Sequence, residues 1–80
     1  MSAEAVVEQI LKRLLILSDR AGKQIRFLRR YLLACVRTVP GASARKVIFY
    51  DEKRNIYFSL FAEEKSFELI ATTVLRKVLR

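Results

Sequence analysis

The start of the chain carries apolar residues at the spacing of an amphipathic helix. Between residues 2 and 17, apolar side chains recur every three or four positions and share one face of a helical wheel. Ser2 is suited to cap such a helix, and Glu4 in its first turn complements the helix dipole. The pattern predicts a helix over residues 2–17 whose core face is Ala3, Val6, Val7, Ile10, Leu14 and Leu17.

A second amphipathic segment follows a break at residues 18–22. The break contains residues suited to cap a helix and Gly22, which disfavours a helix interior. One long helix through this point is the alternative, since only Gly22 argues strongly against it. We predict a separate helix over residues 23–38, ended by Pro40-Gly41. Its expected core face is Ile25, Leu28, Leu32, Cys35, Val36 and Val39.

From Lys46 the period changes to that of a strand. Segments 47–50 and 56–61 are rich in β-branched and aromatic residues and flank a short polar connection, which predicts a β-hairpin. One face carries Val47, Phe49, Ile56, Phe58 and Leu60, and the other carries Ile48, Tyr50, Tyr57 and Phe61. Apolar residues on both faces predict that both sides of the hairpin are substantially covered.

Residues 62–79 have the pattern of a third amphipathic helix. Acidic residues stand near its start and basic residues near its end, the sense that complements the helix dipole. Its expected core face is Phe67, Ile70, Ala71, Val74, Leu75 and Val78. The predicted order is α-α-β-β-α: a helical pair, a hairpin and a C-terminal helix. This is an α+β fold in a single domain over residues 1–80.

Composition limits the chemistry of this domain. Apolar residues make up 52% of the 80 residues, too many for a disordered basic tail. With one Cys and no His, the chain can form neither an internal disulfide, nor a Cys/His zinc site, nor a Cys–His nucleophile. The only Cys, Cys35, falls on an expected core face, and no Gly-rich phosphate loop is present. We therefore expect a protein that is not an enzyme and uses no metal or cofactor.

Charge is the strongest indication of a ligand. The net charge is +8, and residues 12–46 contain ten basic residues but a single acidic one. Four of the cations fall near one line of the second predicted helix, opposite its apolar face, and arginine suits bidentate phosphate contacts. We predict binding to the backbone of RNA or DNA through Lys12, Arg13, Arg20, Lys23, Arg26, Arg30, Arg37, Arg45 and Lys46.

Other interpretations of these residues remain open. A basic helix face can be merely solvated, although such a face normally intersperses acids for support. The alternative function is an adaptor subunit that docks on an acidic protein, or contact with an anionic membrane. Tyr31, Tyr50 and Tyr57 can stack on unpaired bases, whereas tyrosines in strands more often pack across the sheet.

Several apolar residues lie off the predicted core faces of the two helices. A chain of this length can form only a small hydrophobic core. Apolar surface that remains outside such a core often contacts a second copy of the chain. We predict a homodimer whose contacts are Leu15, Ile16, Phe27, Tyr31 and, less favourably because cations surround it, Leu33.

The chain carries no recognisable targeting or membrane-spanning segment. Its apolar stretch over residues 6–17 is interrupted by four polar residues, and an acid stands at position 4. These features predict an intracellular protein, cytoplasmic or nuclear.

Overall fold

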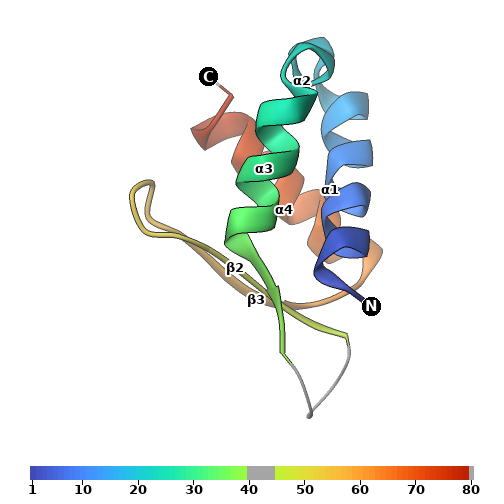
Figure 1. The fold of residues 1–80 in the computed structure, drawn as a ribbon, viewed down its shortest axis with the longest axis vertical. Helices are drawn as coiled ribbons and strands as arrows, with labels where there is room; N and C mark the ends of the chain where they lie inside the picture. The colour runs from blue at the N-terminus through green and yellow to red at the C-terminus, as the bar shows by residue number, and fades with distance from the viewer. Residues whose placement is uncertain (40–44, 80) are drawn as a thin grey trace.

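Three helical segments, a three-stranded sheet and a final helix make a small α+β domain. The computed structural model describes residues 1–39 and 45–79. Its elements are α1 (Ala3–Leu17), α2 (Asp19–Lys23), α3 (Ile25–Cys35), β1 (Val36–Thr38), β2 (Lys46–Asp51), β3 (Ile56–Phe61) and α4 (Glu64–Lys77). The helices stand on one side of the sheet, with α4 behind α1 and α3 (Figure 1). The predicted fold class is confirmed.

Helix α1 is confirmed, although its buried face differs from the predicted one, because Leu17 is exposed and Leu11 is buried. The Ser2 hydroxyl accepts a hydrogen bond from the Ala5 N–H at 3.1 Å and so caps the first turn. The helix ends at Ser18, whose extended backbone (φ −153°, ψ 129°) excludes one continuous helix through the break. The buried face of α1 consists of Val6, Val7, Ile10, Leu11 and Leu14.

The predicted helix over residues 23–38 is wrong at both ends. The short helix α2 ends at Lys23, Gln24 separates it from α3, and α3 ends at Cys35. The next three residues form strand β1, which the sequence analysis missed. Val36 and Thr38 are β-branched and suit a strand, and Val36, which was predicted on the core face of the helix, is buried in the strand. Pairing with β2 therefore decides their conformation, while the predicted stop at Pro40-Gly41 lies outside the described residues.

The predicted hairpin is confirmed and is the larger part of the sheet. The strand order is β1-β2-β3, antiparallel throughout, with Val36 opposite Phe49 and Phe49 opposite Phe58. Between β2 and β3 the chain turns at Asn55, whose left-handed φ of 54° asparagine tolerates better than most residues. The Asn55 N–H donates to the Glu52 carbonyl oxygen at 3.1 Å and closes the turn.

Only one face of the sheet is covered, contrary to the prediction. Val47, Phe49 and Ile56 are buried beneath the helices. On the other face Tyr50, Tyr57 and Phe61 are exposed, because no described element lies on that side of the sheet (Figure 1). The alternation of the strands was predicted correctly, but a hydrophobic residue on an outer face does not require a covering layer.

Helix α4 is confirmed and completes the core. Glu63 precedes it in an extended conformation, and Glu64 stands in its first turn. Its buried side chains pack against α1. The largest fully buried core side chains come from the three longer helices and from β1 and β2, and include Ile10, Leu14, Leu28, Leu32, Phe49, Ile70 and Val74.

Candidate nucleic-acid interface

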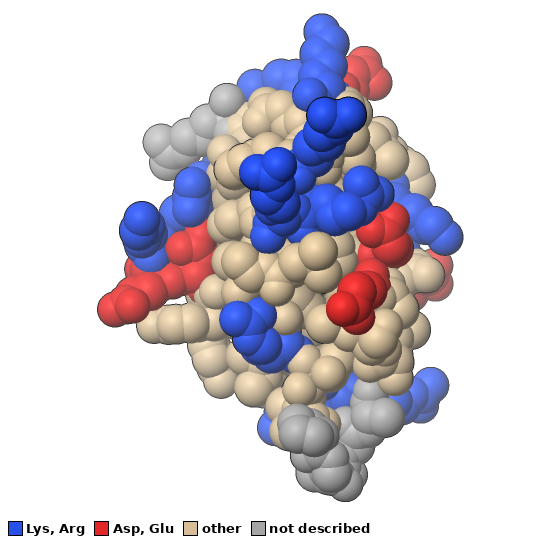
Figure 2. All heavy atoms as spheres, viewed as in Figure 1, with Lys and Arg blue, Asp and Glu red and all other residues tan. Residues whose placement is uncertain are grey.

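Helices α2 and α3 carry a group of exposed cations, which we call the helical basic face: Arg20, Lys23, Arg26 and Arg30. Arg26 and Arg30 are one turn apart on α3, on the side opposite the buried Leu28 and Leu32. Lys and Arg side chains gather over α2 and the upper part of α3, while acidic side chains lie mainly at the two sides (Figure 2).

The helical basic face is distinguished by the absence of acidic partners. Within the described part of the chain, none of its four cations has a carboxylate within 4.0 Å. Arg29, on the same helix, differs: its Nε lies 2.9 Å and its Nη2 3.1 Å from the two carboxylate oxygens of Glu8 on α1. This bidentate hydrogen bonding, with the charge of Arg29, lowers the pKa of Glu8. The fold thus pairs some arginines and leaves the helical basic face unpaired.

Arg13 makes contacts within the fold, although the sequence analysis included it among the predicted nucleic-acid contacts. Its side chain is 12% exposed, and its Nη2 lies 3.0 Å from Glu64 Oε1. Its Nε is 3.8 Å from Glu68 Oε2, and the guanidinium stands 5.4 Å from the centroid of the Phe67 ring. Arg13 therefore joins α1 to α4.

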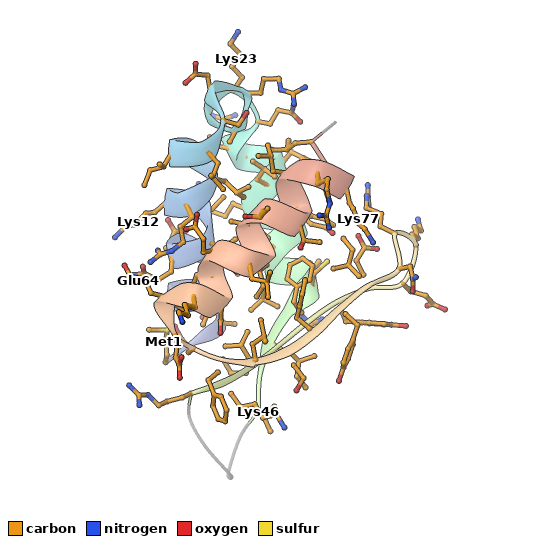
Figure 3. All side chains as sticks on the ribbon, turned by 180° about the vertical axis from the view of Figure 1, so that it is seen from behind. Met1, Lys12, Lys23, Lys46, Glu64 and Lys77 are labelled. Carbon is orange, nitrogen blue, oxygen red and sulfur yellow. The ribbon has the colours of Figure 1, made fainter. Side chains whose placement is uncertain are left out.

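The other predicted cations are spread over the molecule. Lys12 projects from the side of α1 away from α3, and Lys46 on the sheet lies at the end opposite Lys23 (Figure 3). Arg45 is exposed at the start of β2, and its carbonyl oxygen accepts a hydrogen bond from the Ala62 N–H. The nine predicted residues do not form one surface.

Arg37 lies where α3 meets the sheet. Its Nη1 donates to the carbonyl oxygens of Leu33 at 3.2 Å and Val36 at 3.0 Å, so the guanidinium is held at the C-terminal end of the helix. The other N–H groups of its guanidinium make no hydrogen bond to the described residues. Because Arg37 belongs to β1, its side chain also stands at the edge of the outer sheet face.

The predicted dimer residues do not form a continuous surface either. Leu15 and Ile16 are exposed at the end of α1. Phe27 and Tyr31 lie on the flank of α3 that faces the hairpin, whereas α1 packs on the opposite flank, beside Arg29. Leu33 is exposed on the outward side of α3.

Tyr31 has a structural partner that the sequence analysis did not identify. Its hydroxyl donates a short hydrogen bond to Asp51 Oδ2, which also receives Arg54 Nη1 at 3.0 Å. Burial opposes ionisation of Asp51, but these hydrogen bonds prevail and lower its pKa. Burial and the same carboxylate raise the pKa of Tyr31. The phenol therefore stays protonated and joins α3 to the hairpin.

The outer sheet face presents three exposed aromatic side chains. Tyr50 is 51% exposed, Tyr57 62% and Phe61 60%. The two tyrosines face each other across β2 and β3, with ring centroids 6.2 Å apart and planes at 74°. Tyr50 and Tyr57 were predicted as stacking candidates. All three aromatic residues were also assigned to a covered face, and they are exposed because the structure places helices on only one side of the sheet.

Other kinds of site have little basis in the described residues. Cys35 is buried, and burial raises the pKa of its thiol. No three acidic or cysteine side chains of the described segments come together to share a metal ion, and none of their helices is long and apolar enough to cross a membrane. Comparison of the chain with protein-family models, with curated proteins and with solved structures finds no match.

Proposed function

We propose that the protein binds nucleic acid through the helical basic face, by contacts to the phosphate backbone. The observation that carries the proposal is the set of four exposed cations, Arg20, Lys23, Arg26 and Arg30, without an acidic partner among the described residues. Cations that repel one another reduce the stability of a folded chain. A polyanion that binds across them offsets this repulsion and releases its own counterions.

The spacing of the cations suits a backbone ligand better than a single anion. Arg26 and Arg30 are separated by about 6 Å along the helix axis, and α2 extends the row beyond the start of α3. A row of arginine and lysine side chains suits contacts to successive phosphates, so the proposed contact is mainly electrostatic. Binding of this kind depends weakly on nucleotide sequence and strongly on salt.

A charge reversal on α3 tests the proposal. The double variant Arg26→Glu/Arg30→Glu is compared with Lys65→Glu/Arg76→Glu, which makes the same charge change at exposed residues of α4, behind α3 in Figure 1. We expect the α3 variant to lose binding to duplex and single-stranded RNA and DNA, and the α4 variant to lose much less. Fluorescence anisotropy measures the affinities, and circular dichroism verifies that both variants stay folded.

The salt dependence adds a quantitative expectation. If all four cations contact phosphates of a duplex, log K falls with log salt with a slope of about −3.6, and neutral replacement of one cation reduces its magnitude by about one unit. Equal affinities of the two folded double variants would refute this binding face. Indifference to nucleic acid, with capture of one acidic protein instead, would favour the adaptor alternative.

A further inference from the structure

The outer face of the sheet combines exposed aromatic rings with cations. Alternation along the strands places seven side chains on it: Arg37 from β1, Lys46, Ile48 and Tyr50 from β2, and Tyr57, Ser59 and Phe61 from β3. None of these seven residues of the described strands is acidic. The face is therefore apolar, aromatic and positively charged together, unlike the helical basic face, which has cations but few exposed rings.

The strand register arranges these side chains in three rows. Tyr50 pairs with Tyr57 in the first row, Arg37, Ile48 and Ser59 lie side by side in the second, and Lys46 pairs with Phe61 in the third. Successive rows are separated by about 7 Å, twice the rise per residue of a strand. The two rows that carry aromatic rings are thus about 14 Å apart, and the row of Arg37, Ile48 and Ser59 lies between them.

The cations lie toward the β1 edge of this face and two of its three rings toward the β3 edge, while Tyr50 shares the central strand with Lys46. Arg37 is on the β1 edge and Lys46 on the central strand, whereas Tyr57 and Phe61 are both on β3 at the other edge. An unpaired nucleic-acid strand has the same division, with phosphates along one side and bases along the other. Its bases can stack on the rings of Tyr57 and Phe61 while its phosphates run beside Arg37 and Lys46.

A second copy of this chain fits the face less well. An isologous contact across the sheet would bring Arg37 and Lys46 of both copies into one interface. Burying four cations together without acids is unfavourable. The net charge of +8 on each chain adds to this repulsion.

We infer that the outer sheet face binds single-stranded nucleic acid, stacking two or three bases on Tyr50, Tyr57 and Phe61. This inference rests on the proposed function for the class of ligand, and it adds the strandedness of that ligand and a second contact surface. Arg37, which is held at the end of α3, lies between the two surfaces. A bound strand that leaves the sheet at β1 therefore arrives at the helical basic face.

The test separates base stacking from backbone attraction by its choice of probes. The probes are a short single-stranded RNA of mixed sequence, an abasic strand of the same length, and the duplex of the same sequence, each end-labelled for anisotropy. The double variant Tyr57→Ala/Phe61→Ala removes two exposed rings, and Tyr57→Phe keeps the ring. Leu69→Ala, at an exposed apolar residue of α4, is the matched control for loss of apolar surface.

We expect the Tyr57→Ala/Phe61→Ala variant to bind the single-stranded RNA at least about tenfold more weakly, since stacking contributes about 1–3 kcal/mol per base. Its affinity for the abasic strand and the duplex should not change. Tyr57→Phe and Leu69→Ala should bind all three probes like the parent chain. Thermal unfolding of each variant verifies the fold.

Distinct outcomes overturn the inference and the proposed function. Unchanged binding of single-stranded RNA by the folded Tyr57→Ala/Phe61→Ala variant, or an equal loss on all three probes, overturns the inference. Sedimentation of the parent chain as a dimer and of this variant as a monomer does the same, because the face then covers a second copy. If the parent chain binds none of the probes, both proposals fail. If Arg26→Glu/Arg30→Glu abolishes binding and Tyr57→Ala/Phe61→Ala does not weaken it, the proposed function is supported and the inference about the outer sheet face is overturned.

Discussion

Tyr31 joins helix α3 to the turn of the hairpin through a single hydroxyl group. The phenol packs on Phe27 and edge-on against Phe49, and its oxygen donates to Asp51. The sequence analysis assigned Tyr31 to a dimer contact or to base stacking and did not identify Asp51, which is twenty positions further along the chain. Local spacing shows which residues share a helix face. It does not show which distant polar group completes a hydrogen bond.

Replacing Tyr31 by Phe should lower the free energy of unfolding by about 1–3 kcal/mol at pH 7, since it removes a hydrogen bond from Asp51, which is only 8% exposed. The pKa of Asp51 is lowered in the folded state, so its stabilisation is present above the ordinary value of 3.8 and is lost as the pH falls through the folded pKa. The destabilisation by Tyr31→Phe should therefore shrink in acid. Urea unfolding at pH 7 and near pH 3 measures both values.

Tyr57→Phe is the control for that experiment, because its exposed hydroxyl has no hydrogen bond to the described residues. It should change stability by less than about 0.5 kcal/mol at either pH. An equal loss for Tyr31→Phe at both pH values would assign its effect to packing instead of the hydrogen bond.

At the scale of elements, sequence periodicity identified α1, the hairpin and α4 but missed β1. A three-residue strand has fewer residues than one helical turn, so it shows no period of its own. Val36 suits both the apolar face of a helix and the inner face of the sheet. The contacts that decide between them come from β2, whose paired residues are 9 to 13 positions further along the chain. The same limitation affected the charges. Arg13 and Arg26 look alike in sequence, yet only Arg13 meets carboxylates, because these are supplied by α4.

The junction of α1 and α4 gives a prediction at this scale. Arg13→Ala removes two ion pairs with exposed partners and a cation–π contact, together worth about 1–2 kcal/mol. Lys12→Ala, at the exposed neighbouring position, should change stability by less than about 0.5 kcal/mol. Urea unfolding compares the two variants. If both lose the same stability, the contacts of Arg13 with α4 do not contribute.

At the scale of the whole molecule, the cations predicted to bind nucleic acid are spread over several surfaces, among them the helical basic face, the outer sheet face and the side of α1. The sequence analysis included the four residues of the helical basic face among its predicted contacts, together with Lys12 and Lys46, which lie elsewhere on the fold (Figure 3). The predicted homodimer stays a prediction. Since Tyr31 has an intramolecular partner and Phe27 packs on it, the prediction now depends mainly on Leu15 and Ile16 at the end of α1.

Ile16 is the residue that best tests the homodimer, because it is 83% exposed and its replacement should leave the folded monomer intact. The parent chain should sediment as a dimer at micromolar concentration, and Ile16→Asp as a monomer, because a charge at an apolar contact is costly. Equal thermal stability of the two chains in dilute solution is the control. A parent chain that sediments as a monomer would end the prediction.

The direct passage from α3 into β1 constrains how this chain can change in evolution. Cys35, the last residue of the helix, and Val36, the first of the strand, are both buried and adjacent. An inserted residue would either turn the core side of α3 away by about 100° or bring Arg37 to the inner face of the sheet. A deletion has the same effect in reverse. Homologous chains should therefore tolerate substitutions on both sides of this junction while keeping its length unchanged.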